Sequence, residues 1–215
     1  MPIFYFWYNL NMSKKSEIEV YVASIGQAPN INYVPDVLKN DLKKVKDKKI
    51  RLQKQALYNL IYYVFTQRLN IKLNKKSITK DRSGKPLIKN WHVSCSHSKD
   101  LICVAVSKKV NIGIDIEAMQ TRISFERLKE RTYHKNENKY HLNLLNLFYL
   151  WTRKEAIYKM NSKIGKFIPA KIDTTKYLTM SATLEYKKVQ YALSVAAKVN
   201  EHVHINMLDK EIKFK

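Results

Sequence analysis

The heptapeptide NIGIDIE (residues 111–117) carries the strongest structural signal in this sequence. Its three isoleucines alternate with the other residues, and a period of two predicts a β-strand. The same alternation places Asp115 and Glu117 on one face of that strand, with Cα atoms roughly 6–7 Å apart. Two neighbouring carboxylates repel each other unless a positive group lies between them. A lysine cluster or a hard cation such as Mg²⁺ would supply that group, and a solvated strand face is the alternative.

The sequence on either side of this heptapeptide predicts further strands and two long helices. Expected strands cover residues 19–25, 92–97, 101–107, 182–186 and 191–196, with a last one near 202–207. One helix spans the basic run 41–54 and its amphipathic continuation to residue 65, and a second spans residues 142–160. Each half therefore supplies strands and one long helix. This pattern predicts an α+β fold of two similar halves, residues 1–107 and 108–215.

The composition favours a folded chain with an anionic partner. The 215 residues are 45% hydrophobic, so a packed core is expected. Lys and Arg total 40 against 18 Asp and Glu, which gives a net charge of +22. Such an excess points to nucleic acid, an acidic protein, a phosphate-rich ligand or an anionic membrane surface. An AT-rich coding bias is an alternative source of the many lysines.

Several classes of protein are disfavoured by what the sequence lacks. The two cysteines, Cys95 and Cys103, have no zinc-ligand spacing and form no disulfide framework, which fits a reducing cytosol. No apolar run reaches the length of about 18 residues typical of a membrane span. The apolar start lacks the basic segment and cleavage site of a signal peptide. We interpret residues 1–11 as an upstream extension before Met12, with an ordinary N-terminal strand as the alternative.

Two further segments carry residues suited to chemistry. In WTRKEAIYK (151–159), Glu155 and Lys159 share a helix face, either as a surface ion pair or as a metal ligand beside a phosphate-binding lysine. In CSHSKD (95–100), Ser96 and His97 offer hydrogen-bond donors to a phosphate. A nucleophilic Ser–His pair is disfavoured because adjacent strand residues point to opposite faces. The sequence contains neither a nucleophile elbow nor a P-loop.

Taken together, four motifs resemble one family. The order SGKP (83–86), SHS (96–98), IGIDIE (112–117) and WTRKEAIYK (151–159) is similar to that of the 4'-phosphopantetheinyl transferases of the surfactin-synthetase-activating type. The resemblance covers roughly residues 17–200. It implies a pseudo-two-fold α+β fold in a monomeric chain. It also implies transfer of phosphopantetheine from coenzyme A to a carrier-protein serine, with Mg²⁺ or Mn²⁺ and release of adenosine 3',5'-bisphosphate.

The resemblance also assigns roles to individual residues. Asp115, Glu117 and Glu155 would hold Mg²⁺ against the pyrophosphate of coenzyme A. Glu155 would act as general base, and Lys159 would stabilise the phosphate or protonate the leaving group. The residues expected to bind coenzyme A are Lys46, Arg51, Lys85, Ser96 and His97.

The family resemblance explains the positive charge, because a basic enzyme would attract carrier proteins, which are typically acidic. The segment 123–140 would meet the carrier, with Phe125 and Leu128 as candidate contacts, although core packing is the favoured alternative for each of these two residues. The carrier could serve fatty acid, polyketide or nonribosomal peptide biosynthesis, and the sequence does not choose among them. One departure is Ser94, which stands where many relatives have asparagine. We expect a cytoplasmic enzyme with no nucleic-acid or membrane partner.

Two other functions compete with this interpretation. A basic nucleic-acid-binding protein would explain the charge and the 14 tyrosines, but not the paired carboxylates of residues 115–117. A non-catalytic interaction protein on the same fold would have no reason to keep all three carboxylates.

Overall fold

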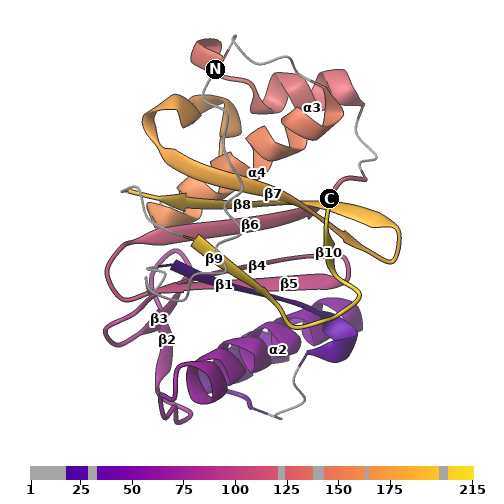
Figure 1. Ribbon diagram of the computed structural model, residues 1–215. Coiled ribbons are helices and arrows are strands. Elements are labelled where there is room, and N and C mark those ends of the chain that lie inside the picture. The colour runs from indigo at the N-terminus through magenta and orange to yellow at the C-terminus, as the bar shows by residue number, and fades with distance from the viewer. Residues whose placement is uncertain (1–17, 29–32, 121–123, 138–142, 163–164, 199–202) are drawn as a thin grey trace, which may run out of the picture.

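The computed structural model describes residues 18–28, 33–120, 124–137, 143–162, 165–198 and 203–215. Within these ranges the chain forms four stacked layers (Figure 1). A helix lies below a first sheet, a second sheet covers the first, and a further helix covers the second sheet, with a shorter helix packed against it. The expected extension at residues 1–11 lies outside the described residues. No described helix combines the length and apolar character needed to cross a bilayer.

The helices and strands have the following bounds. The helices are α1 (Asp36–Lys44), α2 (Lys48–Tyr63), α3 (Phe125–Thr132) and α4 (Leu144–Met160), with short helical turns η1 (Ile25–Gln27), η2 (Val64–Arg68), η3 (Lys135–Glu137), η4 (Pro169–Lys171) and η5 (Thr174–Lys176). The strands are β1 (Ile18–Ser24), β2 (Ile78–Lys80), β3 (Pro86–Ile88), β4 (His92–Ser98), β5 (Leu101–Ser107), β6 (Ile112–Ala118), β7 (Leu178–Tyr186), β8 (Val189–Ala197), β9 (Val203–Met207) and β10 (Lys213–Phe214).

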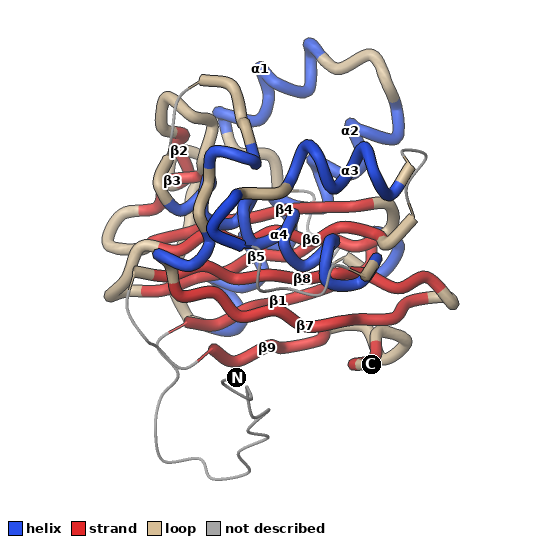
Figure 2. The backbone as a smooth tube through the Cα atoms, turned by 90° about the horizontal axis from the view of Figure 1, so that it is seen from above, coloured by secondary structure: helices blue, strands red, loops and turns tan. Residues whose placement is uncertain are grey.

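The strands form two four-stranded sheets and one small hairpin. The first sheet has the order β4-β5-β1-β9, the second has the order β10-β7-β8-β6, and β2 pairs with β3. All neighbours are antiparallel except β9, which runs parallel to β1. Seen from above, the strands of both sheets run in nearly the same direction (Figure 2). The edge strands β4 and β6 belong to different sheets, and they lie against each other.

Apolar side chains fill each of the three interfaces between layers. The inner faces of the two sheets share one core, in which the isoleucines of β6 meet β1, β5 and β8. A second core lies between the first sheet and α2, where Leu57, Ile61 and Phe65 are buried, as their helical spacing predicts. On the outer face of the second sheet, Ala156 and Met160 of α4 pack against it. The alternation of NIGIDIE therefore has a physical cause: isoleucines face the other sheet, and the remaining residues face α4.

The α+β class is confirmed, and most elements begin and end near their expected bounds. The basic run 41–54 is not one helix, because the chain turns between α1 and α2. The Asp47 side chain accepts hydrogen bonds from the backbone nitrogens of Lys49 and Ile50 and so begins α2 anew. β9 comes from the C-terminal half and completes the first sheet. The division into similar halves at residues 107 and 108 stays a prediction.

Candidate active site

Helix α4 lies unusually close to β6 because of a glycine. A Cβ atom built on Gly113 would lie 1.8 Å from the carbonyl oxygen of Ala156 and 2.6 Å from the nitrogen of Met160. Only a residue without a side chain allows this approach. The contact fixes the height of α4 above the sheet. It thereby sets where Glu155 and Lys159, on the adjoining side of the helix, face the strand.

Asp115 sits at the centre of a buried polar cluster. Its Oδ1 atom accepts hydrogen bonds from Ser96 Oγ at 2.7 Å and from Lys159 Nζ at 2.7 Å, and Lys159 also reaches Ser96 Oγ at 2.9 Å. Asp115 is 1% exposed, and its second oxygen, Oδ2, has no hydrogen-bond partner among the described residues. An unpaired buried carboxylate oxygen is costly, so Oδ2 is available to a cation.

The other two carboxylates share this environment. Burial and the nearby charge of Asp115 raise the pKa of Glu117 to about 7. The same two causes raise the pKa of Glu155 to about 7, and Lys159 opposes the rise. Burial works against the charge of Lys159, but Asp115 and Glu155 outweigh it and raise the pKa of its ammonium. The cluster thus carries more negative charge than one lysine neutralises.

A cavity of about 410 Å³ opens over this cluster. It is lined by Leu38 and Asp41 of α1, Lys54, Leu57 and Tyr58 of α2, Lys80, Gly84 and Pro86 around the small hairpin, Cys95, Ser96 and His97 of β4, Asp115 and Glu117 of β6, and Glu155 and Lys159 of α4. Residues from both halves of the chain therefore form one cavity. Its lining combines the three carboxylates with Lys54, Lys80 and Lys159, a set of charges suited to a polyphosphate bridged by a cation.

Six of the nine residues singled out in the sequence line this cavity: Ser96, His97, Asp115, Glu117, Glu155 and Lys159. Burial, assisted by the nearby charge of Lys159, lowers the pKa of His97, so its imidazole is neutral at pH 7.

The other three, Lys46, Arg51 and Lys85, are not among the lining residues. Arg51 is exposed on α2 and donates to the carbonyl oxygen of Val45 at 2.8 Å. The Lys85 ammonium donates to Asn111 Oδ1 at 3.0 Å and to the carbonyl oxygen of Ile112 at 2.8 Å. In this structure Lys85 therefore ties the small hairpin to the start of β6.

The cavity also contains cationic residues that the sequence did not single out. Lys54 lines it from α2, and Lys80 lines it beside Asp41, with which it forms an ion pair. The Lys80 ammonium also lies 5.7 Å from the ring centre of Tyr58. The sequence could have indicated Lys54, because it precedes Leu57 and Ile61 on one helical stripe and so continues the inward face of α2. The sequence could not have indicated Lys80, because only tertiary packing brings its strand to the cavity.

The residues present fit a hard cation only in part. Within the described ranges, no three His, Cys, Asp or Glu side chains are gathered into a metal cage. The Lys159 ammonium lies instead between Asp115 and Glu155, at 2.7 Å and 3.8 Å from their nearest oxygens. Mg²⁺ typically takes only one or two carboxylates and completes its shell with water and phosphate oxygens. The unpartnered Oδ2 of Asp115 and the two other carboxylates on the same cavity wall are compatible with that kind of site.

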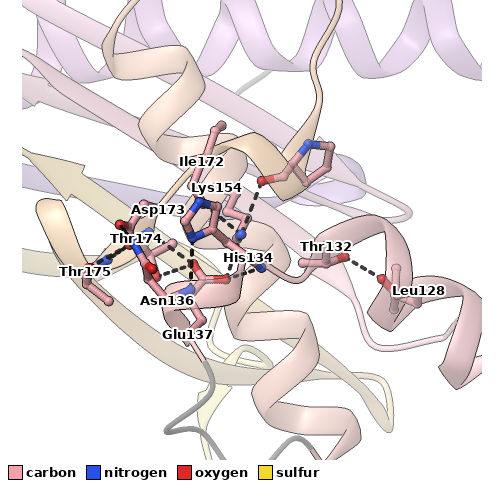
Figure 3. A network of polar contacts seen from close by, with 11 residues as sticks. Leu128, Thr132, His134, Asn136, Glu137, Lys154, Ile172, Asp173, Thr174 and Thr175 are labelled. Atoms are coloured by element: carbon pink, nitrogen blue, oxygen red, sulfur yellow. Dashed lines mark hydrogen bonds and ion pairs between the residues drawn. The ribbon is translucent and has the colours of Figure 1, made fainter.

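Lys154, next to Glu155 in the sequence, does not line the cavity and lies in a buried polar network (Figure 3). Its ammonium pairs with Glu137 Oε2 at 2.8 Å, and both side chains are 0% exposed. It also donates to the carbonyl oxygens of Ile172 at 2.8 Å and Pro169 at 3.2 Å. Lys154 therefore holds α4 to the segments on either side of it, while Glu155 faces the cavity.

Glu137 is fully engaged in the same network. Its Oε1 atom accepts from the nitrogen of Thr174 at 3.0 Å and from Thr174 Oγ1 at 2.7 Å. Its Oε2 atom accepts from the nitrogen of His134 at 2.9 Å, besides Lys154. A carboxylate so enclosed is structural and does not meet a substrate in the cavity.

We expect Lys154→Met to destabilise the protein by about 3–5 kcal/mol, because it leaves the Glu137 carboxylate buried without a counter-charge. Urea denaturation followed by circular dichroism measures this loss. The matched control is Lys176→Met, since Lys176 makes a longer, exposed contact of 4.0 Å with Asp173. That control should melt like the wild type. An equally small effect for Lys154→Met would contradict a structural role for the pair.

The region expected to meet a partner is only partly described. Leu128 is buried against Leu147 and Phe148 of α4, so it belongs to the core and is not a free contact. Phe125 packs beside this cluster and stays half-buried. Ser94, the departure from the resembled pattern, bonds the nitrogen of Ile114 at 3.1 Å and does not line the cavity.

Comparison with known families agrees with this geometry. Residues 111–199 match the family model of the 4'-phosphopantetheinyl transferase superfamily. The matched segment contains β6 and α4, and with them Asp115, Glu117, Glu155 and Lys159. The match therefore supports the general phosphopantetheinyl transferase class for the part of the chain that carries the carboxylates. A search of curated proteins returned no match.

Proposed function

We propose that this protein transfers 4'-phosphopantetheine from coenzyme A to a serine hydroxyl of an acyl or peptidyl carrier protein, as the surfactin-synthetase-activating type does. The observation that carries the proposal is the cavity in which Asp115, Glu117 and Glu155 meet Ser96 and His97 from the other half of the chain. The superfamily match over residues 111–199 supports the same reaction class. The leaving product is adenosine 3',5'-bisphosphate.

In this proposal Asp115, Glu117 and Glu155 would hold Mg²⁺, or Mn²⁺ in its place. The bound ion would neutralise charge on the pyrophosphate and orient it for in-line attack. The support from the chain is the buried Asp115 Oδ2 without a partner and the excess of negative charge around it.

The phosphates of coenzyme A would lie beside the hydrogen-bond donors and cationic side chains of the cavity lining. Ser96 and His97 offer neutral donors from β4, and Lys54 and Lys80 offer positive charge from α2 and β2. Lys46, Arg51 and Lys85, which the resemblance assigns to coenzyme A, lie outside the lining. Contact with the ligand at Lys46 and Arg51 would involve the rim between α1 and α2.

The transfer step moves one proton and exchanges one phosphorus–oxygen bond. The carrier serine loses its proton to Glu155 as its oxygen forms a bond to the β-phosphorus. The bond from that phosphorus to the bridging oxygen breaks, and Lys159 stabilises or protonates the departing phosphate. Glu155 and Lys159 are suited to this division because they lie one helical turn apart at the cavity wall.

The partner would be an acidic carrier protein, drawn to a chain with a net charge of +22. We propose that the enzyme acts as a monomer, because residues of both halves of one chain line the cavity. A cytoplasmic location is proposed from the two cysteines, which are both free thiols in the structure.

The test is intact-protein mass spectrometry of an apo carrier protein incubated with this protein, coenzyme A and Mg²⁺. We expect the carrier to gain one phosphopantetheine, and the gain to disappear with EDTA or with Glu117→Ala. Fatty acid, polyketide and peptide-synthetase carriers are compared in parallel. If no carrier gains mass and coenzyme A does not bind, the proposal is wrong.

A further inference from the structure

The edge strands β4 and β6 are joined by serine side chains where a sheet would use backbone hydrogen bonds. Ser94 Oγ accepts from the nitrogen of Ile114 at 3.1 Å, and Ser98 Oγ accepts from the nitrogen of Ala118 at 3.0 Å. The two serines are four residues apart on one face of β4, and their partners are four apart on β6. They form two equivalent bridges along the seam between the sheets.

Only one of the two bridges also reaches a carboxylate. Ser98 Oγ donates to Glu117 Oε2 at 2.8 Å. A hydroxyl has one proton and two acceptor sites, so accepting from Ala118 leaves the proton free for Glu117. Among the described residues, Ser94 makes no such bond to an acidic side chain. Ser98 and Ser94 therefore make the same kind of bond to the backbone of β6, but Ser98 also binds a carboxylate of the site.

Glu117 needs this restraint more than Asp115 does. Asp115 is short, buried and bound by Ser96 and Lys159. Glu117 has one more rotatable bond, is half-buried, and is repelled by the Asp115 carboxylate on the same strand face. Without a hydrogen bond its carboxylate would gain by turning toward solvent, away from the cavity wall.

We propose that Ser98 is a positioning residue, which holds the Glu117 carboxylate at the cavity wall in readiness for a divalent cation. Ser98 does not itself line the cavity, so it acts through Glu117. The inference rests on the proposed cation role of Glu117 in the transferase. Hydrogen bonds to metal ligands typically change metal affinity by about 10–100-fold.

The experiment titrates the full-length protein with Mn²⁺ alone and follows free Mn²⁺ by electron paramagnetic resonance. We expect Ser98→Ala to weaken Mn²⁺ binding by about 10-fold or more. The matched control Ser94→Ala loses the equivalent backbone bond, so it should lower the melting temperature similarly and keep Mn²⁺ affinity within about 2-fold of the wild type. Ser98→Thr retains the hydroxyl and should restore binding.

In the transfer assay, Ser98→Ala should raise the Mg²⁺ concentration for half-maximal rate and leave the rate at saturating Mg²⁺ nearly unchanged. Equal Mn²⁺ affinities for Ser98→Ala and wild type, or equal losses in both alanine variants, would overturn the proposal. So would a wild-type protein that does not bind Mn²⁺. If Ser98→Ala does not fold, Ser98→Val replaces it, because valine also lacks a hydrogen-bond donor, and undiminished affinity there has the same meaning.

Failure of the positioning role can be told apart from failure of the transferase role. A wild-type protein that binds Mn²⁺ and loses affinity with Ser98→Ala, yet modifies no carrier, would keep the positioning role and remove the proposed reaction. Normal transfer with unchanged Mg²⁺ dependence in Ser98→Ala would keep the proposed reaction and remove the positioning role of Ser98.

Discussion

Asp115→Asn is expected to lower phosphopantetheine transfer by at least about 10²–10³-fold while the protein stays folded. Asparagine keeps the Oδ1 atom that accepts from Ser96 and Lys159, so the buried cluster retains its hydrogen bonds. It replaces the unpartnered Oδ2 with an amide nitrogen, which is a donor and cannot bind a cation. Mass spectrometry of the carrier measures the rate, and circular dichroism confirms the fold.

Glu185→Gln is the matched control for this loss. Glu185 lies on β7 of the same sheet and pairs with Lys215 at 3.1 Å near the surface, so its conversion should leave transfer unchanged. Wild-type transfer by Asp115→Asn would contradict a cation role for Asp115.

The same Asp115 variant tests the competing nucleic-acid-binding function. Removing a negative charge should not weaken binding to a polyanion, so nucleic-acid affinity should be unchanged or slightly higher. Loss of carrier modification together with unchanged nucleic-acid binding would favour the transferase. Unchanged carrier modification together with altered nucleic-acid binding would favour the nucleic-acid-binding function.

Gly113→Ala is expected to destabilise the protein by about 3 kcal/mol, at the upper end of overpacking costs. The added methyl would collide with backbone atoms of Ala156 and Met160, which cannot turn aside as a side chain can. Helix α4 must then rise from β6, and Glu155 and Lys159 move with it. Urea denaturation gives the stability, and the carrier assay gives the accompanying loss of transfer.

The control for this substitution is Gly26→Ala. A Cβ atom on Gly26 meets nothing within 4 Å, so this variant should be as stable as the wild type or slightly more stable. A Gly113→Ala protein that melts like Gly26→Ala would show that α4 does not depend on this close approach.

Much of the fold followed from short-range patterns in the sequence. The alternation in residues 111–117 and 101–107 predicted strands, and the apolar stripe through Leu57 and Ile61 predicted the inward face of α2. The break between α1 and α2 was missed because basic residues continue on both sides of the Asp47 cap. The pairing of β9 with β1 joins the two ends of the described chain, and no local pattern encodes such a contact.

The site was predictable where motif residues share an element and unpredictable where elements meet. Asp115 with Glu117, and Glu155 with Lys159, are neighbours by strand and helix geometry alone. The assignment of Lys85 to the ligand stays a prediction, and in the structure its ammonium donates to Asn111 Oδ1 and to the carbonyl oxygen of Ile112. An ammonium group donates to whichever oxygen the fold brings near, and that choice is set by tertiary packing.

The sequence by itself determined most of the longer strands, the inward face of α2, and the carboxylates that lie within the transferase superfamily match. Only the tertiary structure decided that Lys154 would be buried against Glu137 while its neighbour Glu155 reaches the cavity. It also decided that Ser98 of one sheet would hold Glu117 of the other. The physical reason is that periodicity fixes the direction of a side chain within its own element, whereas its partner is set by packing between elements that are distant in sequence.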